Sequence, residues 1–339
     1  MPAKEIIGHG KILEHLISAV DFEKVSHAYI FNGEDGIGKK FVADYFAKLL
    51  LCNNRIEDKS KPKHLRLRPC ELCPSCLQFD SHSNPDVIYV THEKPRVISV
   101  DEIREQLVNT VSVYPYKGDF KVYIIDEADK MNEQAQNALL KTIEEPPAYA
   151  VIILLTENKD RLLETIKSRC EIIDLKPVEK DMIKTYLMKE FKLPDYAAEN
   201  AARFAAGNIG RAERFAADKD FNEMKDAVLS VMRNLDRNGA AESVTAARKF
   251  ADYKDRTRYL IDLTELWFHD MLVLKATGDA NRLIFRDDYT TLNEQASKRN
   301  YEVIERAMET CENTKKRLDA NVSYDTAMEL MFLHLKDFT

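Results

Sequence analysis

Glycine is scarce in this sequence, at 10 of 339 residues, about 3% against a usual ~7%. This scarcity disfavours a turn-rich all-β chain and favours a helix-rich one. Long apolar runs are also lacking: the longest stretch without a polar residue is 148–155, whereas a membrane-spanning helix needs ~20 residues. Residues 1–16 contain no apolar segment of the kind that a secretory signal carries. We therefore expect a cytoplasmic protein without membrane association.

Neither sign of charge dominates, because 50 Lys and Arg stand against 57 Asp and Glu for a net charge of −7. A mildly acidic chain is not a general DNA coat, although a local basic face remains compatible with it. The segment 53–69 is the basic exception, with six Lys or Arg against two acidic residues. A solvated loop is its ordinary interpretation, and contact with phosphates is the alternative.

The chain changes character near residue 175. Up to that point, short apolar runs alternate with helical patterns, which is typical of βαβ units and a mostly parallel sheet. Strands are predicted at 28–31, 87–90, 122–125, 150–155 and 171–175, and helices at 101–111 and 133–144. Beyond residue 176 only helical patterns follow. We expect an α/β domain at 1–175, a small helical domain at 176–217 and a second helical domain at 218–339.

A glycine-rich loop follows the first predicted strand. Gly33 to Lys39 satisfies the pattern G-x-x-x-x-G-K between a strand and a helix. Gly33, Gly36 and Gly38 let backbone amides curl around phosphate oxygens, and the helix N-terminus adds positive potential. Lys39 would then reach the β- and γ-phosphates of a nucleotide, so these residues, called the phosphate loop below, predict a P-loop fold.

The residue after this lysine predicts impaired hydrolysis. P-loops normally carry Ser or Thr there, and the hydroxyl binds Mg²⁺. Here it is Lys40, whose ammonium offers no lone pair and repels a cation. We therefore expect a site that holds nucleotide weakly or without turnover. The alternative is that Lys40 points to solvent and water takes the ligand position.

An acidic pair, Asp126 and Glu127, ends the strand predicted at 122–125. Asp126 could orient Mg²⁺ through water, and Glu127 could polarise the attacking water. Solvation of the strand end with helix capping is the alternative interpretation. The sequence thus retains one half of a catalytic apparatus and lacks part of the other.

Three cysteines in the pattern Cys-x-x-Cys-x-x-Cys predict a metal site: Cys70, Cys73 and Cys76. Tetrahedral Zn²⁺ needs four ligands, and Cys52 is the obvious fourth, with His64 or His82 as substitutes. An iron–sulfur cluster or unliganded thiols are alternatives. Four protein ligands leave no open position for catalysis, so we expect a structural Zn²⁺ module over 52–76.

Several short motifs resemble those of the bacterial AAA+ clamp-loader subunits: IGH at 7–9, HAY at 27–29, DEADKM at 126–131, NALLKTIEEPP at 137–147, TEN at 156–158 and SRC at 168–170. The resemblance covers residues 1–217. The Gly-Lys-Lys ending of the phosphate loop and the Glu-Ala-Asp-Lys-Met run favour the delta-prime type over the ATP-hydrolysing gamma/tau type.

The resemblance implies a AAA+ P-loop module, a helical lid and an all-α collar. It also implies a hetero-pentamer with gamma/tau and delta subunits, which loads the sliding clamp onto primed DNA within the DNA polymerase III holoenzyme. Clamp-loader subunits of this type carry a Cys₄ zinc module in the same place.

Three single residues gain roles from the resemblance. Asn158 is similar to the first sensor and Arg211 to the second. Arg169 is similar to the arginine finger, which reaches the ATP of a neighbouring subunit, although an ordinary ion pair is its alternative interpretation. The chain's own ATP and Mg²⁺ binding would be weak or absent. Other readings are a gamma/tau-type ATPase or another AAA+ DNA-remodelling ATPase, such as a branch-migration helicase; a small-molecule kinase is remote.

Overall fold

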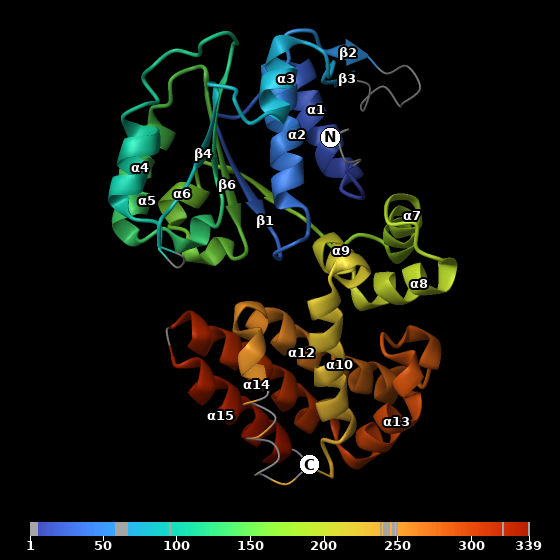
Figure 1. The fold of residues 1–339 in the computed structure, drawn as a ribbon. Helices are drawn as coiled ribbons and strands as arrows, with labels where there is room; N and C mark the ends of the chain where they lie inside the picture. The colour runs from blue at the N-terminus through green and yellow to red at the C-terminus, as the bar shows by residue number, and fades with distance from the viewer. Residues whose placement is uncertain are drawn as a thin grey trace. The chain divides into compact units, whose positions relative to one another are not determined.

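The computed structural model describes residues 6–57, 67–94, 97–237, 239, 245, 248, 250–320 and 322–337 (Figure 1). The chain forms two compact units. Unit 1 combines Met1–Tyr186 with Gly207–Arg211, and unit 2 combines Leu187–Ala206 with Ala212–Thr339. The division into three domains at residues 175 and 217 stays a prediction. None of the helices among the described residues has the length and apolarity that a bilayer crossing requires.

Unit 1 is built on a five-stranded parallel sheet in the order β4-β5-β6-β1-β7. The strands are β1 (Ala28–Asn32), β4 (Val87–Val90), β5 (Lys121–Ile125), β6 (Ala150–Thr156) and β7 (Glu171–Asp174). β1, β5 and β6 are nearly continuous apolar runs because helices cover both faces of the sheet. The predicted strands are confirmed to within one residue at each end.

Helices cover both faces of this sheet, as Figure 1 shows. On one face lie α1 (Gly10–Asp21) and α2 (Lys39–Leu51), with α3 (Pro74–Asp80) packed against α2. On the other lie α4 (Val100–Ile103), α5 (Glu133–Glu144) and α6 (Glu164–Lys167). Successive strand residues alternate between two cores, so that Phe31 packs with α1 and α2 while Ile30 packs with α4 and α5.

The helix predicted at 101–111 is only partly α-helical. A capping box between Ser99 and Glu102 begins α4. The chain then continues as a π-helix, η2 (Arg104–Val108), in which the Asn109 N–H donates to the Arg104 carbonyl at 2.9 Å. The extra residue per turn is a backbone feature that apolar periodicity does not reveal.

The basic segment begins and ends in a short antiparallel ladder. β2 (Ile56–Glu57) pairs with β3 (Leu67–Arg68). Residues 58–66, including His64, lie outside the described residues, so the role of this segment stays a prediction.

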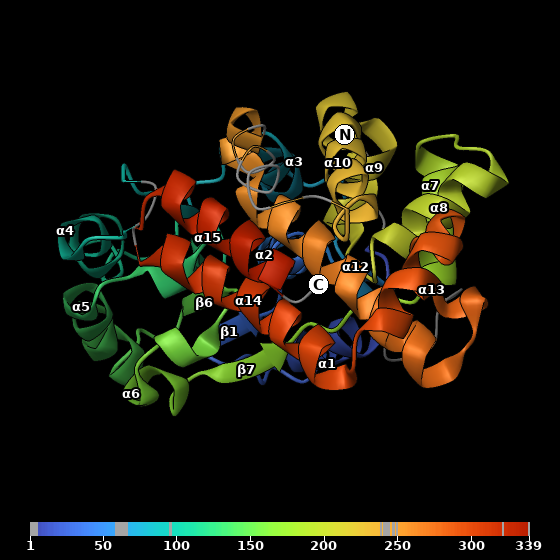
Figure 2. The same cartoon turned by 90° about the horizontal axis from the view of Figure 1, so that it is seen from below.

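Unit 2 is helical throughout its described residues, as the sequence predicts. Two helices, α7 (Lys180–Glu190) and α9 (Ile209–Ala217), have residues in both units. The helices that lie wholly in unit 2 are α8 (Asp195–Phe204), α10 (Lys219–Arg233), η5 (Phe250–Arg256), α12 (Thr257–Thr277), η6 (Ala280–Arg282), η7 (Arg286–Asp288), α13 (Tyr289–Lys298), α14 (Tyr301–Asp319) and α15 (Tyr324–Asp337). In Figure 2, α14 lies beside α12 and α15.

The core of unit 2 contains the chain's single tryptophan, Trp267, which is fully buried on α12. Its indole N–H donates to Gln295 Oε1 at 2.9 Å. The Gln295 amide donates in turn to the Met232 carbonyl at 2.8 Å. These bonds satisfy the buried polar atoms and connect α12, α13 and α10.

Candidate functional site

The phosphate loop joins β1 to α2 at the carboxyl end of the sheet, here called the carboxyl edge. Gly36 and Gly38 adopt left-handed backbone angles, with φ of 80° and 111°, which favour glycine. A Cβ on Gly36 would lie 2.7 Å from Asn208 Oδ1. The predicted loop is therefore present, and Gly36 is needed for close packing as well as for its conformation.

Lys39 is bound by the loop itself. Its ammonium donates to the carbonyls of Gly33 at 2.5 Å and Glu34 at 2.9 Å. The side chain is only 9% exposed. Burial lowers the pKa of Lys39, and nearby carboxylates, of which Glu157 contributes most, oppose this shift. Binding a phosphate would require this ammonium to leave two carbonyl acceptors.

Residues 207–211, called the closing segment below, pack directly on the loop within unit 1. The Gly210 N–H donates to the Gly36 carbonyl at 2.8 Å, and the Asn208 amide donates to the Asp35 carbonyl at 2.7 Å. A Cβ on Gly210 would lie 2.7 Å from Gly36 Cα. Asn208 was not predicted from the sequence as a site residue, although it precedes the predicted sensor Arg211 by three residues.

Arg211, the predicted second sensor, lies beside the phosphate loop, and its role stays a prediction. Its side chain is 10% exposed, and its Nη2 is 3.8 Å from Glu34 Oε2. His9 also contacts the loop, with Nε2 3.0 Å from the Ile37 carbonyl oxygen. The loop is thus held by two separate segments of its own chain.

Lys40 is exposed and lies over an aromatic ring. Its ammonium is 5.7 Å from the centroid of the Tyr89 ring, and the Tyr89 hydroxyl donates to Asp44 Oδ1 at 2.9 Å. Burial raises the pKa of Asp44, while the Tyr89 hydrogen bond and the Lys40 charge oppose this shift. A cavity of about 270 Å³ is lined by Lys40, Tyr89, Val90, Thr91, His92, Ile124, Asp126 and Glu127. The lysine and the first acidic residue therefore face the same cavity.

Both carboxylate oxygens of Glu127 are already engaged. Oε1 is 2.6 Å from Lys130 Nζ, and Oε2 is 3.2 Å from His92 Nε2. Asp126 Oδ1 accepts the backbone N–H of Glu127 at 2.9 Å. Lys130 and His92 therefore occupy the Glu127 oxygens that a water molecule or a metal ion would need.

The amide oxygen of Asn158, the predicted first sensor, is engaged within its own turn. The side chain is exposed, and Oδ1 caps the 3₁₀-helix η4 (Lys159–Arg161) by accepting the Asp160 N–H at 2.9 Å. The residue before it, Glu157, is the carboxylate that raises the pKa of Lys39 most. The role of Asn158 as first sensor stays a prediction.

Arg169 lies at the amino ends of the strands, here called the amino edge. β1 and β7 run parallel, with Tyr29 opposite Glu171 and Asn32 opposite Asp174. Residue 169 is therefore level with the start of β1, and the phosphate loop begins about six residues, or ~20 Å, further along the sheet. The structure thus does not bring Arg169 to the phosphate loop of its own chain.

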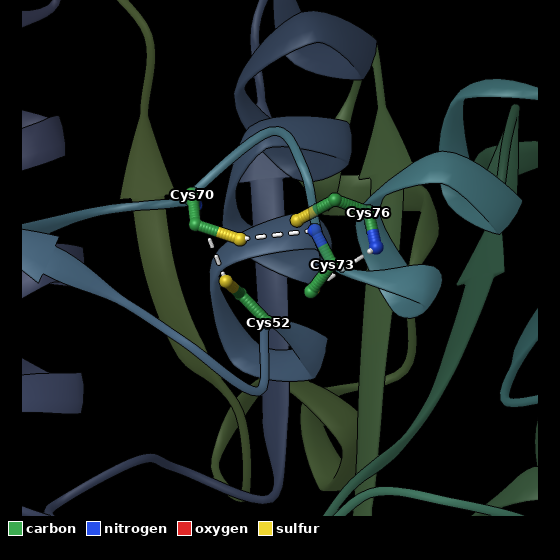
Figure 3. A group of neighbouring side chains, drawn as sticks. All are labelled: Cys52, Cys70, Cys73 and Cys76. Atoms are coloured by element: carbon green, nitrogen blue, oxygen red, sulfur yellow. Dashed lines mark hydrogen bonds between the residues drawn. The ribbon is translucent and has the colours of Figure 1, made fainter.

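The four predicted cysteine ligands converge at the end of α2, as Figure 3 shows. Their sulfur atoms lie within 4.8 Å of one another: Cys52, Cys70, Cys73 and Cys76, the cysteine cluster. Tetrahedral zinc with ~2.3 Å bonds to sulfur places its ligands about 3.8 Å apart, so the donor set fits Zn²⁺. His82 instead lies edge-on to Tyr89.

Backbone donors surround these sulfurs. The Cys70 N–H donates to Cys52 Sγ at 3.3 Å, and the Cys73 N–H donates to Cys70 Sγ at 3.2 Å. Burial opposes ionisation of Cys73, but the N–H groups of Cys76 and Asn53 outweigh it and lower the pKa of Cys73 to about 6. A thiolate is the form that binds a metal. Burial raises the pKa of Cys52 and Cys76, so Cys73 is the one thiol of the cluster whose pKa is shifted toward the metal-binding form.

Comparison with known proteins places the chain in a family. Residues 8–179, about half of the chain, match the family described as "DNA polymerase III, delta subunit". The chain belongs to this family. The resemblance inferred from the sequence motifs is thereby confirmed.

Individual relatives agree with this assignment. The chain is 28% identical over 331 residues to DNA polymerase III subunit delta' of Bacillus subtilis, covering 96% of each protein. It is 32% identical over 211 residues to subunit gamma of Buchnera aphidicola, covering 61% of this chain and 55% of that protein.

The coverage differs between the two kinds of relative. With subunit tau of Salmonella typhimurium, 30% identity over 251 residues covers 71% of this chain and 37% of that protein. The chain thus spans nearly all of the delta' relative and about half or less of the gamma and tau relatives. A solved DNA polymerase III gamma subunit-related protein from Thermotoga maritima aligns with a TM-score of 0.48 at 17% identity, covering 97% of this chain and 99% of that one.

Proposed function

We propose that this chain is a delta-prime-type subunit of the DNA polymerase III clamp loader, which places the sliding clamp on primed DNA. In this role it hydrolyses little ATP itself and supplies Arg169 to the ATP site of a neighbouring subunit. The observation that carries the proposal is the contrast between the two edges of the sheet. Lys39 is hydrogen-bonded to its own loop at one edge, while the Arg169 side chain is 40% exposed at the other.

The expected partners are gamma/tau and delta subunits in a hetero-pentamer. Two observations support this over a gamma/tau-type role: the delta' relative matches over 96% of both proteins, and Lys40 stands where a P-loop that hydrolyses ATP carries Ser or Thr. The all-α unit 2 offers the helical surface that a collar requires, and the three-domain division of the chain belongs to the same proposal.

The donor set at the phosphate loop fits Mg²⁺ poorly. The position that normally supplies a hydroxyl ligand carries Lys40, whose ammonium faces the same cavity as Asp126. Glu127, the proposed base, is already engaged by Lys130 and His92. We therefore assign weak or no nucleotide turnover to this chain and derive no catalytic step from its own loop.

The cysteine cluster, in contrast, fits Zn²⁺, which four thiolates would hold as a closed structural site. Its place at the end of α2 connects the zinc module to the helix that begins at the phosphate loop. Zinc would stabilise this end of unit 1 rather than take part in a reaction.

Steady-state Mg-ATP hydrolysis tests the proposal in two steps. The purified chain and its Lys39→Ala variant should show equal, background-level rates. A clear rate that vanishes in the variant would instead favour a gamma/tau-type motor. In the reconstituted loader, Arg169→Ala should abolish most of the hydrolysis that clamp and primed DNA stimulate, without dissociating the complex. Unchanged turnover in that variant complex would remove the finger assignment.

A further inference from the structure

The guanidinium of Arg169 is bound on the surface of its own subunit. Nη1 donates to the Thr165 carbonyl at 3.0 Å and to Ser168 Oγ at 3.2 Å. Nη2 is 2.9 Å from Glu144 Oε1. Both terminal nitrogens are therefore engaged inside one chain, and Glu144 is the one partner of the three that carries a charge.

Glu144 and Arg169 come from separate elements that meet at the amino edge. Glu144 is the last residue of α5, which Pro146 and Pro147 prevent from continuing. Arg169 follows α6 and precedes β7. The carboxylate is thus held at a helix end next to the arginine, in a position set by the backbone.

This ion pair is suited to opening. Both side chains are partly exposed, at 40% for Arg169 and 46% for Glu144, and water and salt screen such pairs strongly. A carboxylate within contact distance of a polyphosphate would also repel it. Arg169 can therefore present its full charge to a phosphate of another subunit when its Nη2 leaves Glu144.

We propose that Glu144 is a positioning residue that latches Arg169 on its own subunit until a neighbouring ATP site competes for the guanidinium. This inference rests on the proposed function, since it requires Arg169 to act in trans. Glu144 would hold the arginine away from the neighbour in the resting loader, and release would accompany the docking of the two subunits.

The expected effect is modest in size and defined in direction. Exposed ion pairs shift an equilibrium by roughly two- to five-fold. Removing the carboxylate should therefore raise ATP hydrolysis by the reconstituted loader by about two- to five-fold in the absence of clamp and DNA. The stimulated rate should change less, because the arginine is already released there.

The experiment compares two isosteric variants in the full reconstituted loader. Glu144→Gln removes the latch charge. Glu145→Gln removes the same charge one residue later, from an exposed side chain that the structure does not pair with Arg169. Unstimulated kcat and KM for ATP are measured for both, because a latch changes kcat while a structural defect lowers activity and the thermal midpoint of the chain together. The double variant Glu144→Gln/Arg169→Ala should match Arg169→Ala alone.

Each outcome is decisive. A rise in unstimulated kcat for Glu144→Gln alone, absent from the double variant, supports the latch. Unchanged or reduced turnover, or an equal rise for Glu145→Gln, overturns it. If Arg169→Ala abolishes stimulated hydrolysis but Glu144→Gln raises nothing, the latch fails while the proposed function stands. If Arg169→Ala has no effect, the proposed function fails and the latch with it.

Discussion

The two edges of the sheet in unit 1 use their charged residues in opposite ways. At the carboxyl edge, Lys39 is buried and bonded to two carbonyls, and the closing segment adds backbone and amide hydrogen bonds to the same loop. At the amino edge, Arg169 and Glu144 are both partly exposed. A buried, satisfied cation is costly to move, whereas an exposed ion pair exchanges partners readily.

The two edges thus hold two kinds of cation: Lys39 is already paired inside the loop, whereas Arg169 stays accessible at the surface. The glycines of the phosphate loop still allow close approach, but here the group that approaches Gly36 is Gly210 of the same chain. Four predictions test how far the two edges differ.

The largest expected effect is at the amino edge. In the reconstituted loader, Arg169→Lys keeps the charge but loses the planar fork that binds phosphate oxygens. Arginine fingers contribute 10³–10⁵ in kcat in related phosphoryl transfers, so stimulated hydrolysis should fall on the order of 10²-fold or more. Arg104→Lys, at another exposed arginine, is the control and should change the rate less than about two-fold. Full activity of Arg169→Lys would contradict a role for the planar guanidinium.

The next largest effect is a loss of stability at the cysteine cluster, at the end of α2. Cys73→Ser should remove the zinc and destabilise unit 1 by several kcal/mol, below the ~10–16 kcal/mol that structural zinc contributes in small fingers. Elemental analysis and urea unfolding measure both. Amide hydrogen exchange should accelerate around residues 33–38 more than around 165–169. Cys170→Ser, outside the cluster, should retain the metal, and equal metal loss in both variants would contradict the ligand set.

A smaller effect should follow from crowding at the carboxyl edge. The Cβ that Gly210→Ala introduces would lie 2.7 Å from Gly36 Cα and 3.0 Å from the Gly36 oxygen, so backbone must shift. Overpacking of this kind costs about 1–3 kcal/mol, measurable as a lower urea midpoint. Gly10→Ala is the matched control, because nothing lies within 4 Å of its added Cβ. Equal midpoints for the two variants would show that the closing segment is not tightly packed.

The smallest effect is a pH dependence at the end of β7. Hydrogen bonds from Lys159 and Asn32 lower the pKa of Asp174 below its ordinary value of 3.8. A depressed pKa contributes stability that is complete above 3.8 and is lost as the pH falls through the lowered value. Asp174 is 49% exposed, so the loss should be roughly 0.2–1 kcal/mol. This loss of stability at low pH should vanish in Asp174→Asn and persist in Asp119→Asn. Urea unfolding midpoints measured between pH 2 and 5 test both expectations.

The strands were predictable because each is a short, mainly β-branched or aromatic run between turn residues, and burial on both faces requires that pattern. The end of α5 was predictable because Pro146 and Pro147 follow it. The pairing of β2 with β3 was not, since two-residue strands have no measurable periodicity. The π-helix at 104–108 also leaves the apolar pattern nearly unchanged.

At the site, the sequence predicted the residues of the motifs but not the hydrogen bonds and ion pairs that they form. Lys39 and Asp126 follow from motif spacing. The bonds of Lys39 to Gly33 and Glu34, and the contact of Gly210 with Gly36, depend on chain segments that meet only after folding. The Glu144–Arg169 pair joins residues 25 positions apart in separate elements, so no local pattern encodes it.

The buried tryptophan gives unit 2 a fluorescence signal that unit 1 lacks. Because Trp267 is the single tryptophan in the chain and is fully buried, its selectively excited fluorescence follows the unfolding of unit 2 alone. Cobalt in place of zinc at the cysteine cluster would give unit 1 its own visible absorption. The two signals could then be recorded in one titration, and their coincidence or separation would measure directly whether the two units unfold as one cooperative body.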